Sequence, residues 1–242
     1  MNEEIKKESK LSLKWLYLPW LGAIFVCLVI GMIGAAVQGD PEPVIQKLGL
    51  GIDVFSLSIY GIGMVITIAI LYSLLKKSQL SWDAVGLKGK LSSRAICYAL
   101  GCVLIALLLY PLIEISLKPI GVSMYWGGES SAALLTSPVA VVLVLISAVL
   151  IAPITEEIIH RGYVLTMFLE RGFKPMVAIL LSVLIFTSIH IFFGLGIMVY
   201  IFFWAFIPTF LYLKFKSLYP AILFHFTNNL IAYIILPLLS SI

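Results

Sequence analysis

The stretch Glu156-Glu157-Ile158-Ile159-His160-Arg161 lies in a chain that is otherwise a series of long apolar runs. Residues 138–154 before it and 162–169 after it are almost entirely apolar. A carboxylate in the middle of a membrane-spanning helix costs about 2.5–3.5 kcal/mol on insertion scales, and this stretch holds two of them. Such groups normally face a protein interior or a water-filled cavity, where they find partners. The stretch therefore predicts a membrane helix bundle with a functional centre inside it.

The composition supports a membrane protein. Of the 242 residues, 62% are hydrophobic and only 12% are charged, whereas soluble domains are about 45–50% apolar and about 25% charged. The net charge of +4 does not indicate nucleic-acid binding, because the cations are few and lie between apolar runs. In such positions they act as determinants of membrane topology.

Apolar runs of about the 20 residues that a membrane-spanning helix needs recur along the chain. They predict an all-α, polytopic bundle of about seven transmembrane helices, at about 15–37, 52–75, 95–117, 138–169, 175–193, 195–213 and 218–239. Lysines and arginines gather in every second loop, so the positive-inside rule places the N-terminus in the cytoplasm and the C-terminus outside.

The chain divides into three parts by its pattern. Residues 1–14 form a charged cytoplasmic tail, 15–137 accessory transmembrane helices with their loops, and 138–242 a four-helix core that contains the acidic stretch. Ser137-Pro138 resembles an N-cap followed by a proline at the first helical position. A helix from there to Arg171 would be about 50 Å long. We therefore expect it to be tilted, bent near Pro153, or extended into the cytoplasm.

Polar residues that can meet the acidic stretch lie in the last four runs, which contain all three histidines of the chain. Residues four apart share a helix face, so His225 and Asn229 point the same way, as do Phe186 and His190. Glu156, His190, His225 and Asn229 each lie about 14–24 Å along their helices from the nearest cytoplasmic cations. The spacing thus permits one site built from three helices.

The chemistry open to such a site is hydrolysis of a carbonyl compound. Glu156 can act as a general base on water, with His190 sharing the proton work. His225 and Asn229 offer donors to an oxyanion. Alternatively, Glu156, His190 and His225 hold a zinc ion with one open position. The residues therefore leave open whether the site uses zinc as a cofactor or uses none.

The same residues resemble the CAAX proteases and bacteriocin-processing enzymes, also called the CPBP or Abi intramembrane proteases. That family has E-E-x-x-x-R, F-x-x-x-H and H-x-x-x-N on separate membrane helices. Here the three motifs are Glu156-Glu157 with Arg161, Phe186 with His190, and His225 with Asn229. The resemblance covers about 138–239 and rests on three motifs in order, since each alone is unspecific.

The resemblance implies an intramembrane endopeptidase, a hydrolase that cleaves a membrane-associated protein or peptide, and a bacterial cell membrane as its location. Its catalytic set would be Glu156, Glu157, His190, His225 and Asn229. Glu156 would activate water with the help of His190, while His225 and Asn229 would stabilise the oxyanion or bind metal. Arg161 would give structural support by pairing with Glu157. Position 160 is more often aromatic in the family, and His160 is open to a ligand role or a packing role.

Two other functions compete with proteolysis. A proton-coupled transporter also uses buried Glu and His residues, but we find no inverted repeat and no pair of broken helices in the sequence. A non-catalytic immunity or scaffold protein of the same family would not need the intact motifs. The expected partners are the lipid bilayer and a peptide or protein substrate, with no nucleic acid. A prenylated C-terminus, a leader peptide and another membrane peptide all remain open as substrates.

Overall fold

The computed structural model describes residues 11–125 and 134–240, which form helices and no β-strand. The predicted all-α membrane bundle is confirmed. Within the described residues, six helices are long and apolar enough to cross a membrane. The run expected at 175–193 forms the shorter helix α8, Pro175–Ser188, of 14 residues. It is followed by a turn instead of continuing to residue 193.

The α-helices are α1 (Leu21–Val37), α2 (Glu42–Gln46), α3 (Ile52–Lys77), α4 (Ser93–Leu117), α5 (Pro138–Val144), α6 (Ala152–Glu157), α7 (Thr166–Glu170), α8 (Pro175–Ser188), α9 (Leu195–Trp204), α10 (Phe206–Phe215), α11 (Tyr219–Leu230) and α12 (Leu236–Ser240). Three π-helical segments continue them: η7 (Leu145–Ile151), η8 (Ile158–Leu165) and η9 (Ile231–Ile235). Short 3₁₀ turns are η1 (Leu13–Trp15), η2 (Leu18–Trp20), η3 (Trp82–Val85) and η4 (Lys118–Ile120).

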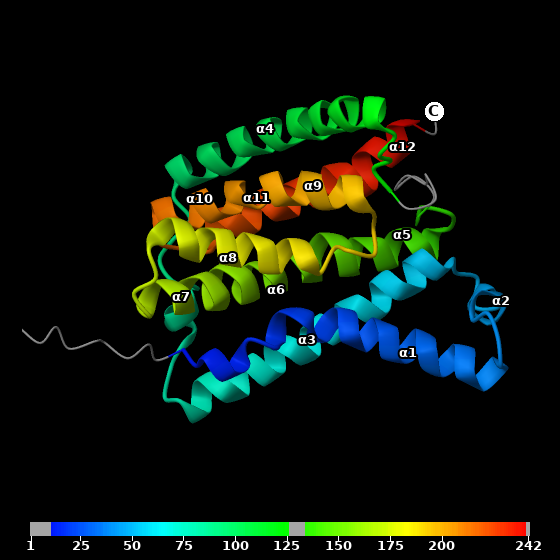
Figure 1. The fold of residues 1–242 in the computed structure, drawn as a ribbon, viewed down its shortest axis with the longest axis horizontal. Coiled ribbons are helices and arrows are strands. Elements are labelled where there is room, and N and C mark those ends of the chain that lie inside the picture. Colours follow the sequence, from blue (N-terminus) through cyan, green and yellow to red (C-terminus); the bar gives the residue numbers. More distant parts are fainter. Residues whose placement is uncertain (1–10, 126–133, 241–242) are drawn as a thin grey trace, which may run out of the picture.

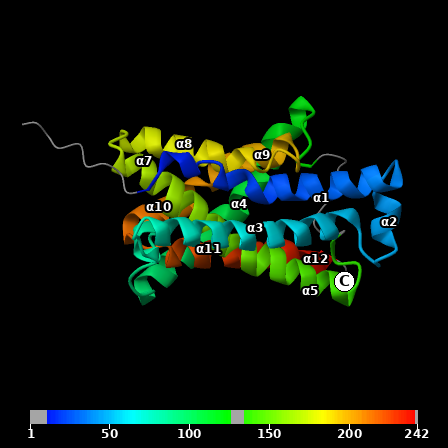
Figure 2. The same cartoon turned by 90° about the horizontal axis from the view of Figure 1, so that it is seen from below.

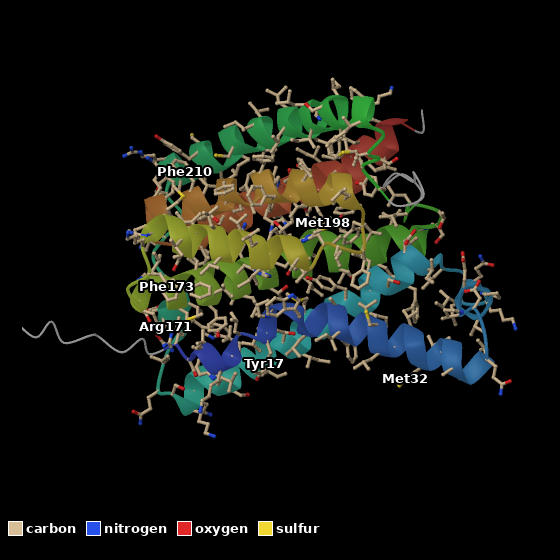
Figure 3. The ribbon with its side chains drawn as sticks, in the orientation of Figure 1. Tyr17, Met32, Arg171, Phe173, Met198 and Phe210 are labelled. Carbon is tan, nitrogen blue, oxygen red and sulfur yellow. The ribbon has the colours of Figure 1, made fainter. Side chains whose placement is uncertain are left out.

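The long helices run back and forth along the long axis of the molecule (Figure 1). Helix α4 lies on one side, α1 and α3 on the other, and α6, α8 and α11 between them. Helices α1 and α3 lie side by side in the second view as well (Figure 2). Arg171 marks the end of the bundle where α7 meets α8 (Figure 3), and the C-terminus lies at the opposite end. Helices α6, α8 and α11 thus have neighbours on both sides in this view, although α8 still exposes Met176, Val177 and Leu184.

The helix that carries the acidic stretch runs from Pro138 to Glu170 over 33 residues. Its start is as predicted, since the Ser137 side chain accepts a hydrogen bond from the backbone N–H of Ala140 at 3.1 Å. It is not α-helical throughout, because α5, α6 and α7 are separated by the π-helical η7 and η8. Single π-helical turns within longer helices often occur at functional sites.

The N-terminal part of the predicted tail lies outside the described residues, which begin at Leu11. Leu11 is fully buried. The hydroxyl of Tyr163 donates to the carbonyl of Ser12 at 2.8 Å, and Arg171 donates to the carbonyl of Leu11 at 3.3 Å. Residues 11–14 are therefore attached to the helix that carries the acidic stretch.

Candidate active site

The ion pair expected from the sequence is present in the interior of the bundle. Glu157 and Arg161 are 0% and 1% exposed, and Arg161 Nη1 lies 2.9 Å from Glu157 Oε1. The guanidinium also donates to the carbonyl of Ala205 at 2.9 Å, and it lies over the ring of Phe186 at 4.5 Å. A buried charge is tolerated only when it is paired and hydrogen-bonded, as it is here.

His225 links the two neighbouring acids. Its Nδ1 lies 2.9 Å from Glu157 Oε1, and its Nε2 lies 3.9 Å from Glu156 Oε2. An ionised carboxylate only accepts hydrogen bonds, so we assign the hydrogen to Nδ1. In the neutral form of the ring, Nε2 is an acceptor and faces the carboxylate oxygen Glu156 Oε2. His225 and Glu156 are both nearly buried, at 4% and 5% exposed.

Tyr60 on α3 completes the surroundings of Glu156. Its hydroxyl donates to Glu156 Oε1 at 2.8 Å. The ring is held against α1, where a Cβ on Gly22 would come within 2.8 Å of the tyrosine ring and of Met64 Sδ. Only glycine at position 22 allows this approach. The sequence analysis missed Tyr60 because α3 carries none of the motifs, and no spacing rule relates residue 60 to residue 156.

His190 lies in the turn after α8 and does not reach the acids directly within the described residues. Its Nδ1 lies 2.9 Å from the carbonyl of Phe186. Since a carbonyl only accepts, Nδ1 donates and Nε2 is left as an acceptor. The ring packs against Phe186 and Phe193, with centroids 4.9 and 5.8 Å apart. It remains within electrostatic range of Glu156.

Asn229 contacts the backbone of the helix that carries the acids. Its Nδ2 donates to the carbonyl of Ala148 at 2.9 Å. In η7 the N–H of Ala152 bonds to the carbonyl five residues back, that of Ser147. The next residue, Pro153, has no N–H, so the carbonyl of Ala148 loses its donor. Asn229 supplies that donor, and its second amide hydrogen has no partner among the residues that the structure describes.

His160 is fully buried and packs as an aromatic ring. Its centroid lies 4.8 Å from that of Phe186, edge to face. Neither ring nitrogen has a hydrogen-bond partner within the described residues. Its backbone carbonyl accepts from Ser182 at 3.0 Å, which ties η8 to α8. Of the two roles left open for His160, these contacts favour packing.

The proposed zinc ligands do not form a metal site as they stand. Within residues 11–125 and 134–240, no group of three or more His, Cys, Asp and Glu side chains is placed to hold a metal ion. Of the set Glu156, His190 and His225, Glu156 and His225 lie 3.9 Å apart, and His190 forms no ion pair with Glu156 among the described residues. A catalytic zinc site needs three protein ligands and an open position.

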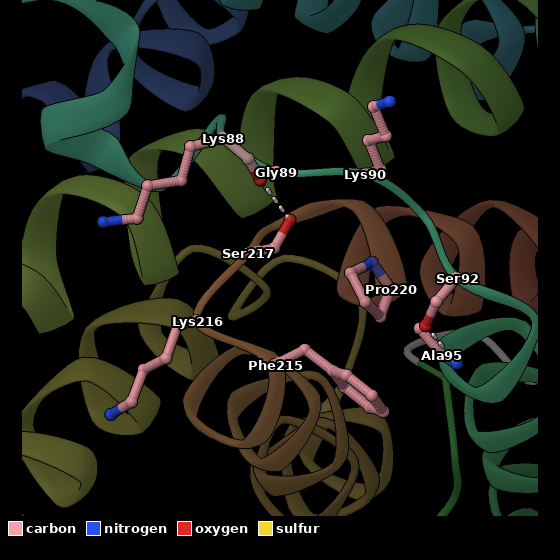
Figure 4. A pocket seen from close by; sticks show the side chains of 9 residues that line it. All are labelled: Lys88, Gly89, Lys90, Ser92, Ala95, Phe215, Lys216, Ser217 and Pro220. Atoms are coloured by element: carbon pink, nitrogen blue, oxygen red, sulfur yellow. Dashed lines mark hydrogen bonds between the residues drawn. The ribbon is translucent and has the colours of Figure 1, made fainter.

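Two cavities lie near the bundle surface. One, of about 460 Å³, lies between residues 88–95 and 215–220, and none of the site residues lines it (Figure 4). The other, of about 430 Å³, is an apolar groove between α1 and the end of α8, and its wall includes Ile189 and Ile191 on either side of His190. This groove therefore lies beside the turn that carries His190, although no site residue lines it.

A comparison with protein families agrees with the motifs. Residues 138–231 match the model of a family described as type II CAAX prenyl endopeptidase Rce1-like. The family resemblance seen in the sequence is thereby confirmed over this segment, and at the family level it supports an endopeptidase. Together with its apolar helices, the match identifies the chain as an integral membrane protein. No curated protein and no solved structure matched the chain.

Proposed function

Because residues 138–231 match a family of CAAX endopeptidases, we propose that this protein hydrolyses a peptide bond in a membrane-associated protein or peptide by means of a glutamate-activated water. The residues proposed to act are Glu156 and His225, supported by Tyr60, Glu157 and Arg161. His190 and Asn229 contribute at the edges of the same site.

The observation that carries the proposal is that the side chains of Glu156 and His225 face each other in the interior of the bundle. Glu156 Oε2 and His225 Nε2 are 3.9 Å apart, a separation that one water molecule bridges with two hydrogen bonds. A water that donates both hydrogens to these atoms keeps its lone pairs directed away from them. The lone pairs are then available for attack on a carbonyl carbon. The arrangement is one that general-base catalysis requires.

In the proposed reaction Glu156 takes a proton from the water as its oxygen attacks the carbonyl carbon. A tetrahedral oxyanion forms, and the free amide hydrogen of Asn229 is the donor we assign to it. The proton then passes from Glu156 to the leaving amine as the C–N bond breaks, which gives a carboxylic acid and an amine. His190, whose Nε2 is an acceptor, is the residue that we assign to help hold the water or its proton.

The remaining contacts hold this geometry. Arg161 fixes Glu157, and Glu157 fixes His225 through Nδ1. That hydrogen bond selects the tautomer whose Nε2 can accept a proton. The apolar groove beside His190 gives a membrane-embedded substrate a route from the bilayer. None of these steps requires a metal ion.

The test compares the peptides in membranes of cells that contain the wild type with those of cells that contain Glu156→Gln. The substitution keeps the size of the side chain but removes the base. The control is Glu114→Gln, which changes an exposed acid on α4 that has no part in the site. We expect at least one peptide that is present with the wild type and with Glu114→Gln, and absent with Glu156→Gln, at equal protein levels.

The same peptides in all three samples would overturn the proposal. That result, with Glu156→Gln accumulating normally, would favour a non-catalytic membrane protein of the same family. The product peptide, once identified, also names the substrate for the kinetic tests below.

A further inference from the structure

The cavity of about 460 Å³ has no part in the proposed function, yet it has a distinctive lining. It lies between the segment that precedes α4 and the loop that joins α10 to α11 (Figure 4). Its walls carry three lysines and no acid: Lys88, Lys90 and Lys216. Phe215, Pro220 and Ala95 give it an apolar side. This combination of cationic rim and apolar wall points to an amphiphilic anion.

The two segments are joined by hydrogen bonds, so the cavity is a built feature of the fold. The backbone N–H of Leu218 donates to the carbonyl of Gly86 at 2.9 Å, and Ser217 Oγ donates to the carbonyl of Lys88 at 2.7 Å. Ser217 and Leu218 are buried. Tyr212 packs against Gly86 so closely that a Cβ there would collide with its ring. The backbone that carries the lysines is therefore preorganised.

The charges around the cavity are unbalanced. Lys88, Lys90 and Lys216 are exposed, and none of them forms an ion pair with a carboxylate in the part of the chain that the structure describes. Helix α4 begins at the same wall, with Ser92 as its N-cap and no acid in its first turn. The start of a helix attracts anions through its unpaired N–H groups and its dipole. Both features favour an anion over a cation at this cavity.

The ammonium groups extend outward in Figure 4, with Lys88 and Lys216 on one side of the opening and Lys90 on another. Lysine stems are long and flexible, so the ammonium groups can turn onto a bound phosphate by rotation about side-chain bonds. Apolar stems also lie readily along apolar surface at the edge of a membrane.

We propose that this cavity binds the phosphate of an anionic phospholipid headgroup. The lysines that line it are among the cations that place this end of the bundle at the cytoplasmic surface of the membrane, which is the depth of the headgroup layer. Basic pockets between transmembrane helices on that side bind anionic headgroups. Phe215 and Pro220 would contact the glycerol and the first methylene groups of the lipid.

The test is a titration of the detergent-solubilised full chain with phosphatidylglycerol, followed by native mass spectrometry, with phosphatidylcholine as the neutral lipid. The site variant combines Lys88→Gln, Lys90→Gln and Lys216→Asn, since Asn tolerates the left-handed backbone of residue 216 (φ 53°). The control variant combines Lys76→Gln, Lys77→Gln and Lys174→Gln. It removes the same number of charges from the same predicted surface, outside the cavity.

We expect the wild type to bind phosphatidylglycerol in preference to phosphatidylcholine, and the site variant to bind it at least roughly tenfold more weakly. The control variant should bind it as the wild type does. If lipid binding were weakened equally in the site variant and the control variant, the proposal would be overturned. That result would show that the lipid responds to the net charge of the protein and not to this cavity. Unchanged binding in the site variant would overturn it too.

A further arm replaces the lipid by inorganic phosphate and measures the unfolding temperature of the same three proteins. Little stabilisation by millimolar phosphate supports a lipid ligand. Stabilisation of the wild type by free phosphate, lost in the site variant, would overturn the lipid source. The unfolding temperatures measured without any ligand show whether each variant is folded. If a triple variant is unfolded, the single variant Lys90→Gln is used in its place.

Discussion

Glu156 and Glu157 are neighbours in the sequence, but their partners give them different properties. One oxygen of Glu157 accepts from Arg161 and from His225. Glu156 accepts from Tyr60 on Oε1, while its Oε2 faces His225 across 3.9 Å. A carboxylate that is held by a hydrogen bond on one oxygen and can accept a proton on the other is suited to act as a general base. The doubly engaged Glu157 suits a support for the histidine.

At this scale the contribution of Tyr60 can be tested by Tyr60→Phe, which removes only the hydroxyl. Hydrogen bonds to charged groups contribute about 1.5–3 kcal/mol, and about 1.4 kcal/mol is a tenfold change in rate. We expect kcat to fall at least about tenfold. KM should stay the same, because Tyr60 orients Glu156 and is not assigned a contact with substrate. The measurement is steady-state kinetics on the peptide identified with Glu156→Gln.

The matched control for Tyr60 is Tyr233→Phe, a second tyrosine within electrostatic range of Glu156 that has no hydrogen bond to it in the structure. It should keep kcat near the wild-type value. Equal losses in both variants would contradict a specific role for the Tyr60 hydroxyl. A fall in the unfolding temperature of Tyr60→Phe alone would assign its effect to stability.

Whether the reaction needs a metal ion depends on the positions of the three candidate ligands, Glu156, His190 and His225. Among the described residues no three candidate ligands are placed to hold a metal ion, so we expect a chelator such as 1,10-phenanthroline to leave the activity of the purified protein unchanged. The measurement is the cleavage rate before and after chelation. Loss of activity that zinc restores would refute the metal-free reaction, and it would mean that His190 moves toward the other two ligands.

Among the elements, the helix from Pro138 to Glu170 differs most from what its sequence predicts. The depth comparison assumed an α-helical rise throughout, but η7 and η8 lie on either side of α6. A π-helical segment shifts the faces that later residues present. The sequence predicted that the two acids face the interior of the bundle, and they are buried there. Because the π-helical segments change which residues face each other, the sequence could not predict that His225 bonds to Glu157 or that Asn229 bonds to the backbone.

That helix also supplies a prediction about Asn229. If Asn229 replaces the donor that Pro153 lacks, Asn229→Ala leaves the carbonyl of Ala148 unsatisfied and lowers the free energy of unfolding by about 1–2 kcal/mol. In a Pro153→Ala background the backbone N–H is restored and can bond to Ala148 itself. The same change should then cost much less. The measurement is a double-mutant cycle of unfolding in detergent.

Thr227→Ala on the same helix is the control, since Thr227 has no part in this contact, and it should show no coupling to position 153. Equal costs of Asn229→Ala in both backgrounds would rule out the backbone role. If the double variant is stable but inactive, the second amide hydrogen has a separate task in the reaction. That outcome agrees with the oxyanion role assigned to Asn229.

For the whole molecule, the sequence predicted the class of fold and the segment that the family model matches. Long apolar runs leave few alternatives to a helix bundle, because each backbone polar group in lipid must be satisfied within its own helix. The partners between helices were harder to predict. Tyr60 and Glu156 are 96 residues apart, and their contact depends on how closely α1 and α3 approach at Gly22. Single-sequence periodicity carries no information about such approaches.

The direction of the chain through the membrane is the last property that can be tested. Helix α8 has 14 residues and is about 21 Å long, shorter than a hydrocarbon core of about 30 Å. We nevertheless expect α8 to cross the membrane, because only then do the loops rich in lysine and arginine all lie on the same side. In intact cells a membrane-impermeant maleimide should label Lys47→Cys and a cysteine added after the C-terminus. It should label Lys174→Cys only after permeabilisation, in a background that lacks Cys27, Cys97 and Cys102. Labelling of the C-terminal cysteine only after permeabilisation would show an even number of crossings, with α8 entering and leaving on one side.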